Sequence, residues 1–215
     1  MITENNTAKV NYLTRDFDIS DIYDPAWERA AVVQIDRYWS GVEAPEGRRA
    51  KVRLLWSDNA LYVAFVADQT EPYVISAAPN VRHKTLDLWD RDVCEIFVAP
   101  DPGRLTKYFE FEVAPTGEWV DLGIEVFSDK RSRDDAYHSG MQSIARRERG
   151  QYVVIMRIEW RAFGRFPNAG DIWRGNLFRC VGKDPDRGYL AWQPTLTEEP
   201  SFHVPERFGH FIFTR

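Results

Sequence analysis

Residues 51–68, KVRLLWSDNALYVAFVAD, contain the pattern that decides the fold. Apolar side chains recur at every second position on both sides of a polar Asp-Asn turn: Val52, Leu54 and Trp56 before it, and Leu61, Val63 and Phe65 after it. A period of two that is interrupted by turn residues is typical of a β-hairpin and not of a helix. We therefore expect two antiparallel strands that bury one shared face.

The same alternation recurs along the rest of the chain. Further strands are expected near 92–99, 107–114, 118–124, 141–148, 151–160, 174–182, 189–193 and 208–213. Helical signals are short: residues 24–30 begin with an N-cap and a proline, and residues 161–166 form one turn after a strand. The pattern predicts an all-β fold, an antiparallel β-sandwich of the immunoglobulin-like or jelly-roll type, with about ten strands in two sheets and short helical turns.

Length and composition are those of one domain. The 215 residues are 44% hydrophobic and include 8 Trp, 9 Tyr and 13 Phe, enough to fill one substantial core. We expect residues 1–215 to form a single domain in which residues 1–9 are poorly ordered. Residues 69–88 are the longest segment without periodicity, and a loop of that length in a compact domain is often functional.

The charge balance and the apolar runs exclude two classes of partner. A formal net charge of −5 lacks the basic excess that a phosphate backbone requires, so nucleic acid is not expected as a partner. No apolar run approaches the roughly eighteen residues needed to cross a bilayer, so we expect no membrane partner. The N-terminus shows no secretory signal pattern, which predicts a cytoplasmic protein unless a leader was removed.

The two cysteines, Cys94 and Cys180, each lie inside a strand-like apolar run. Two cysteines do not form a disulfide framework, and free cysteine is among the most buried residue types. Buried free thiols are expected, with one bridge between sheets as the alternative.

The stretch LWDRDVCEIFV, residues 88–98, contains the first candidate site residues. Trp89 is flanked by charged residues at a strand entrance, so its indole is either an exposed platform for a sugar ring or a cap on the core. Glu95 lies in mid-strand with apolar neighbours on the opposite face. A charge at that position must face solvent or a cleft, because burying it unpaired is costly.

Two further carboxylates, Glu110 and Glu112, share one face of the following strand. If the two strands are neighbours, three carboxylates lie close together. Such a group could bind sugar hydroxyls or a calcium ion, or act as the acid/base pair of a glycosidase. The alternative is a charged outer sheet face that is balanced by Arg and Lys.

Four blocks in order resemble the family 9 carbohydrate-binding module and its DOMON-like relatives. They are WDRDVCEIFV (89–98), YFEFEVAPTG (108–117), GDIWRGN (170–176) and FGHF (208–211), and the similarity extends over about residues 27–213. The resemblance implies a β-sandwich in which two aromatic rings sandwich a terminal sugar while polar residues hold its hydroxyls. It places Trp89 at the first ring position and Glu95 at a hydroxyl-binding carboxylate. Phe202 stands near the second ring position, where binding modules have tryptophan, and Glu112 stands where they have a basic residue.

The remaining candidates lie in the last third of the chain. Arg174 and Asn176 are candidate polar contacts on one strand. Trp192 precedes Pro194 and a loop that delivers Phe202 and His203, although a tryptophan after an apolar run also fits the core. His203 is either a donor to a sugar hydroxyl or a surface polar group. The expected ligand-binding set is Trp89, Glu95, Glu112, Phe202, Arg174, Asn176, Trp192 and His203.

Cofactors are not required by any motif. A structural calcium ion would use loop oxygen donors, for which the candidates are Asp58, Asp68, Asp90 and Asp101. The four histidines are scattered, so no zinc site is expected. Some DOMON relatives hold haem between methionine and histidine, but the close spacing of His138 and Met141 would not place them on opposite sides of one iron.

The predicted function is non-catalytic carbohydrate binding, in which a saccharide stacks between aromatic side chains and its hydroxyls form hydrogen bonds with carboxylates. One alternative is a glycan-processing hydrolase that uses paired carboxylates. The other is a β-sandwich interaction domain that has lost its ligand; it would show carboxylates paired with arginines and no open groove.

Overall fold

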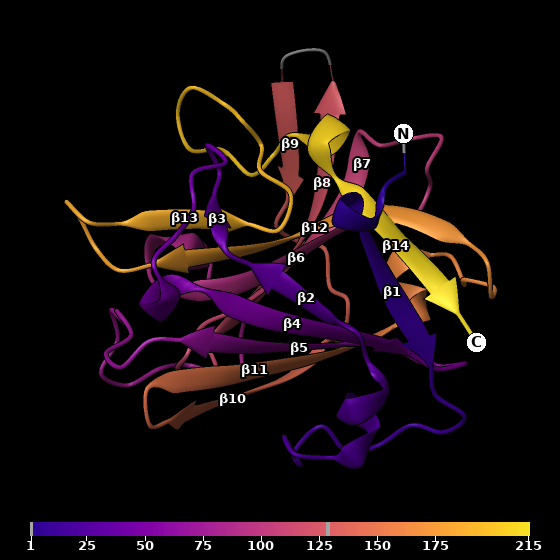
Figure 1. Ribbon diagram of the computed structural model, residues 1–215, viewed down its shortest axis with the longest axis horizontal. Helices are drawn as coiled ribbons and strands as arrows, with labels where there is room; N and C mark the ends of the chain where they lie inside the picture. The colour runs from indigo at the N-terminus through magenta and orange to yellow at the C-terminus, as the bar shows by residue number, and fades with distance from the viewer. Residues whose placement is uncertain (1, 128–129) are drawn as a thin grey trace.

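Strands account for most of the regular structure in residues 2–127 and 130–215, the part of the chain that the computed structural model describes (Figure 1). The strands are β1 (Thr7–Tyr12), β2 (Val32–Ile35), β3 (Arg37–Tyr38), β4 (Ala50–Trp56), β5 (Ala60–Asp68), β6 (Val93–Ala99), β7 (Lys107–Val113), β8 (Trp119–Phe127), β9 (Lys130–Asp134), β10 (Gln142–Glu148), β11 (Gln151–Glu159), β12 (Ile172–Val181), β13 (Gly188–Ala191) and β14 (Gly209–Thr214). Short 3-10 turns lie between them: η1 (Glu4–Asn6), η2 (Pro25–Arg29), η3 (Glu46–Arg48), η4 (Leu88–Asp90), η5 (Trp160–Phe163) and η6 (Pro205–Arg207).

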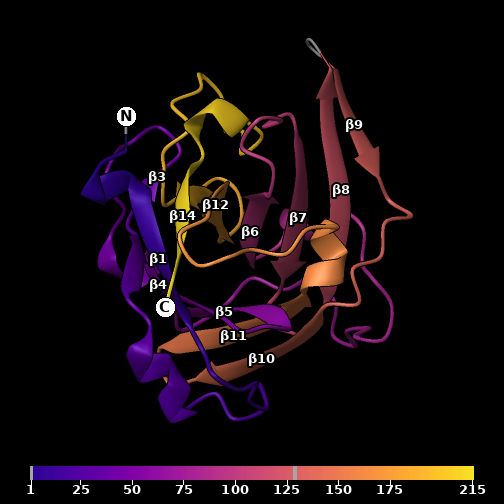
Figure 2. The same cartoon turned by 90° about the vertical axis from the view of Figure 1, so that its right-hand side faces the viewer.

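The strands hydrogen-bond into one curled sheet in the order β10-β11-β5-β4-β1-β14-β12-β6-β7-β8-β9. β2 adds to β4, while β13 joins β12 and β3 joins β13. Neighbours are antiparallel except β1, which is parallel to both β14 and β4. The curl brings the half that contains β5, β10 and β11 against the half that contains β6, β7 and β8, as Figure 2 shows. The result is a sandwich whose two layers are joined through β1 and β14.

Strand alternation divides the apolar side chains between separate cores. The central core lies between the two layers and includes Val52, Leu54, Phe65, Cys94, Ile96, Val98, Phe111, Val154, Trp160, Trp173 and Phe211. The outer core covers the other face of the β6-β7-β8-β12 layer and includes Leu88, Phe97, Tyr108, Leu122, Phe178, Cys180, Phe202 and Phe208. A third cluster packs residues 13–30 against β5 and β11. The candidate site residues of β6 and β7 therefore face the outer core and not the interior of the sandwich.

The predicted β-sandwich is confirmed, with several differences in detail. Residues 51–68 form the β4–β5 hairpin, and the Asp24 carboxylate accepts a hydrogen bond from the Ala26 N–H at the start of η2. The structure has fourteen strands in one continuous sheet where about ten in two sheets were expected, and β1 is parallel to its neighbours. Of residues 1–9, which were expected to be poorly ordered, Met1 lies outside the described residues, Glu4–Asn6 form η1, and β1 begins at Thr7, which pairs with His210 on β14.

Cys94 and Cys180 are free thiols, as expected. They lie on neighbouring strands but on opposite faces, because Cys94 belongs to the central core and Cys180 to the outer core. A bridge between them would have to pass through the sheet. Among the described residues, no helix has the length and hydropathy needed to span a membrane.

Candidate functional site

A cavity of about 170 Å³ opens on the outer face of the β6-β7-β8 layer, next to the segment that precedes η6. Its walls are formed by residues that lie far apart in the sequence: Trp89, Glu95, Phe97, Glu110, Glu112, Leu122, Ile124, Arg131, Arg133, Cys180, Tyr189, Pro200, Ser201, Phe202 and His203. An apolar cavity of about 150 Å³ accepts benzene. The cavity is therefore large enough for one six-membered ring.

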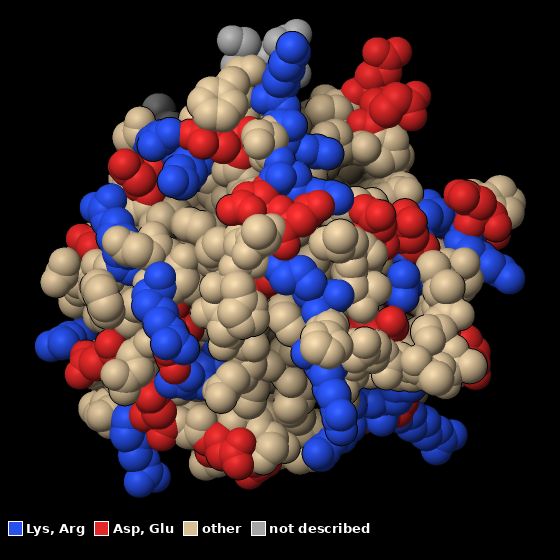
Figure 3. All heavy atoms as spheres, turned by 180° about the vertical axis from the view of Figure 1, so that it is seen from behind, with Lys and Arg blue, Asp and Glu red and all other residues tan. Residues whose placement is uncertain are grey.

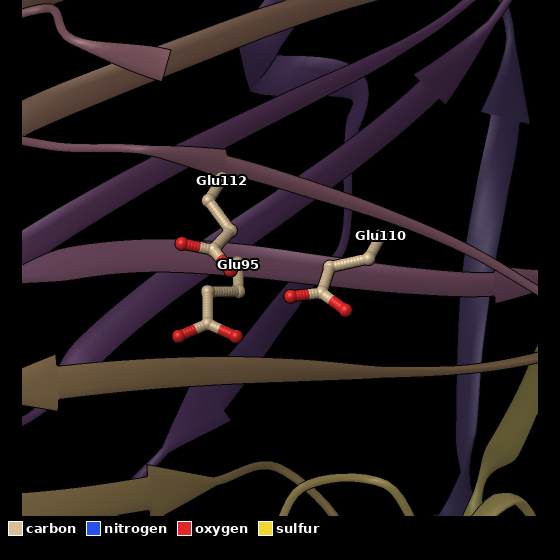
Figure 4. Close-up of side chains that lie close together, drawn as sticks. All are labelled: Glu95, Glu110 and Glu112. Carbon is tan, nitrogen blue, oxygen red and sulfur yellow. The ribbon is translucent and has the colours of Figure 1, made fainter. Parts of the chain in front are cut away.

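Three glutamates of two neighbouring strands meet in this cavity. Glu95 on β6 lies directly opposite Glu112 on β7, and Glu110 lies two residues before Glu112 on the same face. One oxygen from each carboxylate lies within 4.8 Å of the other two. Figure 4 shows the three carboxylate groups gathered between the strands. The three residues, called the glutamate triad below, are only 1%, 2% and 0% exposed.

Three of the six carboxylate oxygens of the glutamate triad are buried without a hydrogen-bond partner among the described residues. Glu95 Oε1 accepts from the Cys180 thiol at 3.3 Å, but Glu110 Oε2 and both oxygens of Glu112 are buried without a donor among the described residues. Burial raises the pKa of all three carboxyls, and the charge of the neighbouring glutamates raises the pKa of Glu95 and of Glu112 further. Burial therefore favours the protonated form of these carboxyls more than it does for an exposed glutamate.

The aromatic walls come from two loops. Trp89 is half-buried in η4, and Asp87, with a φ of 57°, comes directly before that turn. The guanidinium of Arg133 on β9 lies 5.3 Å from the centre of the Trp89 ring, and Asp87 holds that guanidinium at 3.1 Å. Across the outer core, Phe202 stacks on Phe178 with 4.1 Å between ring centres and is only 8% exposed.

His203 forms part of the cavity wall as a neutral ring. Its Nδ1 is hydrogen-bonded to the Tyr108 hydroxyl at 2.8 Å, and its ring lies 5.2 Å from that of Phe97. Burial, with a smaller contribution from the charge of Arg131, lowers the pKa of His203 to about 3. The imidazole is therefore uncharged at neutral pH.

Five of the eight expected ligand-binding residues line this cavity: Trp89, Glu95, Glu112, Phe202 and His203. Folding brings them together from positions more than 110 residues apart in the sequence. The other three, Arg174, Asn176 and Trp192, do not line it.

Arg174 and Asn176 hold loops in place. The Arg174 Nε donates to the carbonyls of Phe208 and Gly209 at 3.0 and 3.1 Å. Asn176 is fully buried; its amide donates to the Gln193 carbonyl at 2.8 Å, and its Oδ1 accepts from the N–H groups of Leu177 and Gln193. The structure thus places these two residues outside the cavity, with polar atoms engaged by the backbone, and their role as ligand contacts stays a prediction.

Trp192 packs against the central core, the alternative that the apolar run before it in the sequence had suggested. Its ring is parallel to that of Phe211, with 5.8 Å between centres. It also lies directly over Gly209, where an added Cβ would be 2.4 Å from the indole. Trp192 therefore lies outside the cavity, and its role as a ligand contact stays a prediction.

Arg131, Arg133 and Tyr189 also line the cavity but were not predicted from the sequence. The two arginines are two positions apart on β9, which places them on one face, but the strand is polar and fully exposed and shows no apolar alternation. Residues 69–88, the expected functional loop, do not line the cavity. That loop instead runs beside β8, where the Trp119 indole N–H donates to the Val81 carbonyl at 3.0 Å.

The expected cofactor residues do not assemble into a site. Among the described residues, the glutamate triad is the one group of three or more Asp, Glu, His or Cys side chains close enough to hold an ion, and none of the expected loop aspartates belongs to it. The His138 side chain is 69% exposed, whereas Met141 is buried in the central core. These two residues do not face a common haem pocket.

The triad also lacks the arrangement of a glycosidase. Glycosidase carboxyls flank the scissile bond at about 5–5.5 Å or about 6.5–9.5 Å, depending on the mechanism. Here the three carboxylates project from the same face of two neighbouring strands and gather on one wall of the cavity, so they do not flank a bound substrate. An interaction domain that had lost its ligand was expected to show carboxylates paired with arginines and no open groove. Neither feature is found, because no described arginine lies within ion-pair distance of the triad and the cavity is open.

Comparison with known proteins gives a match over almost the whole chain. Residues 19–214 match the family described as "Carbohydrate family 9 binding domain-like". The chain is 22% identical over 189 residues to endo-1,4-beta-xylanase A of Thermotoga maritima, which covers 82% of this chain. The chain spans only 16% of the length of that xylanase.

Solved structures share the fold. A protein from Bacteroides uniformis superposes with a TM-score of 0.75 at 16% identity, covering 97% of this chain and 99% of the other. A family 9 carbohydrate-binding module from Caldicellulosiruptor kristjanssonii, in complex with cellotriose, superposes with a TM-score of 0.68 at 18% identity, covering 97% of this chain and 93% of the other. A structure of a module from the same organism in complex with glucose also has a TM-score of 0.68.

Proposed function

Because the chain belongs to the carbohydrate family 9 binding domain-like family, we propose that its cavity binds a saccharide without converting it chemically. The observation that carries the proposal is the composition of the cavity wall. Trp89 and Phe202 supply aromatic surface, and the glutamate triad supplies polar groups that are not fully engaged by the protein. Sugars present apolar C–H patches between hydroxyls, so they need both kinds of surface at once.

The protonation state of the triad suits hydroxyl groups. A carboxylate accepts hydrogen bonds from hydroxyls, whereas a carboxyl that keeps its proton also donates one. The raised pKa values of Glu95 and Glu112 allow both roles within one cluster. The neutral His203 adds a further uncharged polar ring to the wall.

The size of the cavity limits the affinity. Room for one ring predicts recognition of a single sugar unit, with Kd values from about millimolar to micromolar, or about 4–8 kcal/mol. The chain is expected to recognise a saccharide at one unit and not along an extended groove.

Calorimetric titration against a panel of mono- and oligosaccharides tests the proposal. Glucose and cellotriose belong in the panel, since family 9 modules of C. kristjanssonii are bound to them. We expect heat of binding with at least one saccharide and its loss in Trp89→Ala. Absence of heat with every saccharide, or unchanged binding in Trp89→Ala, contradicts the proposal.

We propose that saccharide binding requires no cofactor. Calcium is the alternative occupant of the glutamate triad, because carboxylate oxygens are its preferred ligands. Titration of the protein after EDTA treatment, and again with added Ca²⁺, is expected to give the same saccharide Kd. A saccharide affinity that depends on Ca²⁺ would show that an ion belongs to the site.

A further inference from the structure

Basic and acidic side chains lie interspersed on the face of the molecule that Figure 3 shows, whereas the glutamate triad is a buried cluster of three acidic groups. No ion pair within 4.0 Å joins any of its three carboxylates to a described lysine, arginine or histidine. Arg133 lines the same cavity, but Asp87 and Asp135 engage its guanidinium at 3.1 and 2.5 Å. Arg131 is exposed on the edge strand β9. Burying three carboxyls with so few partners is costly in free energy. A cationic ligand would offset this cost and would therefore bind here more favourably than a neutral one.

The spacing of the triad oxygens fits an ammonium group. Charge-assisted N–H···O bonds are about 2.7–2.9 Å long, so three acceptors around one tetrahedral nitrogen lie about 4.6 Å apart. The triad places one oxygen of each carboxylate within 4.8 Å of the other two. An ammonium group has three N–H donors and no acceptor, which matches three acceptors in one cluster.

The surroundings favour an organic cation over a metal ion. A calcium ion takes six to eight oxygen ligands, while one oxygen of Glu95 already faces the Cys180 thiol. The rest of the wall is largely aromatic or aliphatic, including Trp89, Phe202 and Leu122. A metal ion on the triad would leave this apolar part of the cavity unfilled, whereas a ring that carries an amine would cover both parts.

We propose that the saccharide bound in this cavity is an amino sugar, whose protonated amine is held by Glu95, Glu110 and Glu112 while its ring lies against Trp89. This inference rests on the proposed saccharide-binding function. It adds that the ligand carries a positive charge and that the triad selects for it.

The test compares amino sugars with their neutral parents by calorimetry in EDTA. Glucosamine and galactosamine are titrated against glucose and galactose, with N-acetylglucosamine as a neutral derivative that keeps the nitrogen. The titrations run at about pH 6, below the pKa of about 7.7–8.0 typical of an α-amino group. We expect an amino sugar to bind about tenfold or more tightly than its parent, as hydrogen bonds between charged groups predict, and the N-acetyl derivative to lose this gain.

Two variants assign the selectivity to the triad. Glu112→Gln and Glu110→Gln each keep the size of the side chain but replace an ionisable carboxyl with a neutral amide. The ratio of the affinity for the amino sugar to the affinity for its neutral parent is therefore expected to fall towards one. Glu125→Gln is the matched control, because Glu125 is on the adjacent strand β8, pairs with Arg104 and does not line the cavity. It should leave the ratio unchanged.

Three results would overturn the inference: a neutral sugar that binds as tightly as its amino counterpart, a preference that survives both triad substitutions, or a preference that requires added Ca²⁺. These differ from failure of the proposed function, in which neither amino nor neutral sugars bind.

Discussion

Replacing Trp89 with alanine removes the ring against which we expect the sugar to lie. Trp89 is half-buried in η4 and keeps part of its indole on the cavity wall, while Arg133 lies 5.3 Å from the ring centre. The substitution therefore deletes ligand-facing surface from a short turn and leaves the strands of the outer core in place.

The size of the effect follows from the area that the sugar would cover. A tryptophan side chain has about 150–250 Å² to bury in total. If about 50 Å² of the indole is covered by ligand, the gain is about 1.3 kcal/mol at about 25 cal/mol per Å². Binding also buries a similar apolar area of the sugar, which raises the total contribution to the binding free energy to about 2.5 kcal/mol. Loss of that contribution corresponds to about a 70-fold increase in Kd.

Calorimetric titration of Trp89→Ala with the best-binding saccharide measures this loss. Trp119→Ala is the matched control, because Trp119 is also a half-buried tryptophan near a strand end but packs towards the central core. We expect a loss of between about tenfold and about 70-fold in Trp89→Ala and little change in the control. A folded Trp89→Ala protein with wild-type affinity would refute the placement of the sugar on this ring.

Further predictions concern the packing and protonation of the same face. Phe202→Ala removes a ring stacked at 4.1 Å on Phe178, so we expect a loss of about 3–5 kcal/mol in the free energy of unfolding, measured with urea; wild-type stability would contradict the described packing. Burial raises the pKa of the triad above that of the unfolded chain, so its contribution to stability is complete below about pH 4.3 and is lost as pH rises through the folded pKa values. Glu112→Gln should reduce this loss, and urea unfolding across a pH series that gives the same slope as wild type would argue against a buried, protonated triad. Asn176→Ala leaves the Gln193 backbone groups without their partners and should cost about 1–3 kcal/mol of stability with an unchanged saccharide Kd; a change in Kd alone would return Asn176 to the ligand contacts.

Much of the fold was predictable because strand alternation is a local property. The β4–β5 hairpin and strands such as β6 and β11 show apolar alternation or apolar runs between turn residues, and each lies where it was expected. β9 was missed because a short, polar edge strand with every residue exposed has no apolar period. The parallel position of β1 was also missed, since its pairing with β14 joins residues about 200 positions apart.

The site was only partly predictable, because alternation along a strand is local whereas the contacts of a side chain are set by distant segments. Glu95, Glu110 and Glu112 followed from the period of two and from the assumption that neighbouring strands pair, which proved correct. Asn176 and Arg174 occupy the same sheet face, but the backbone groups that engage them belong to returning loops near Gln193 and Phe208. Periodicity assigns a residue to a face, whereas only tertiary structure shows whether its polar atoms are already satisfied.

A crystal structure of the protein grown or soaked with the best-binding saccharide tests the central claim most directly. We expect density for a sugar ring in the cavity, against Trp89 and on the Phe202 side, with polar groups of the sugar at hydrogen-bond distance from the glutamate triad. Density for the sugar at another surface, with this cavity unoccupied, would contradict the account.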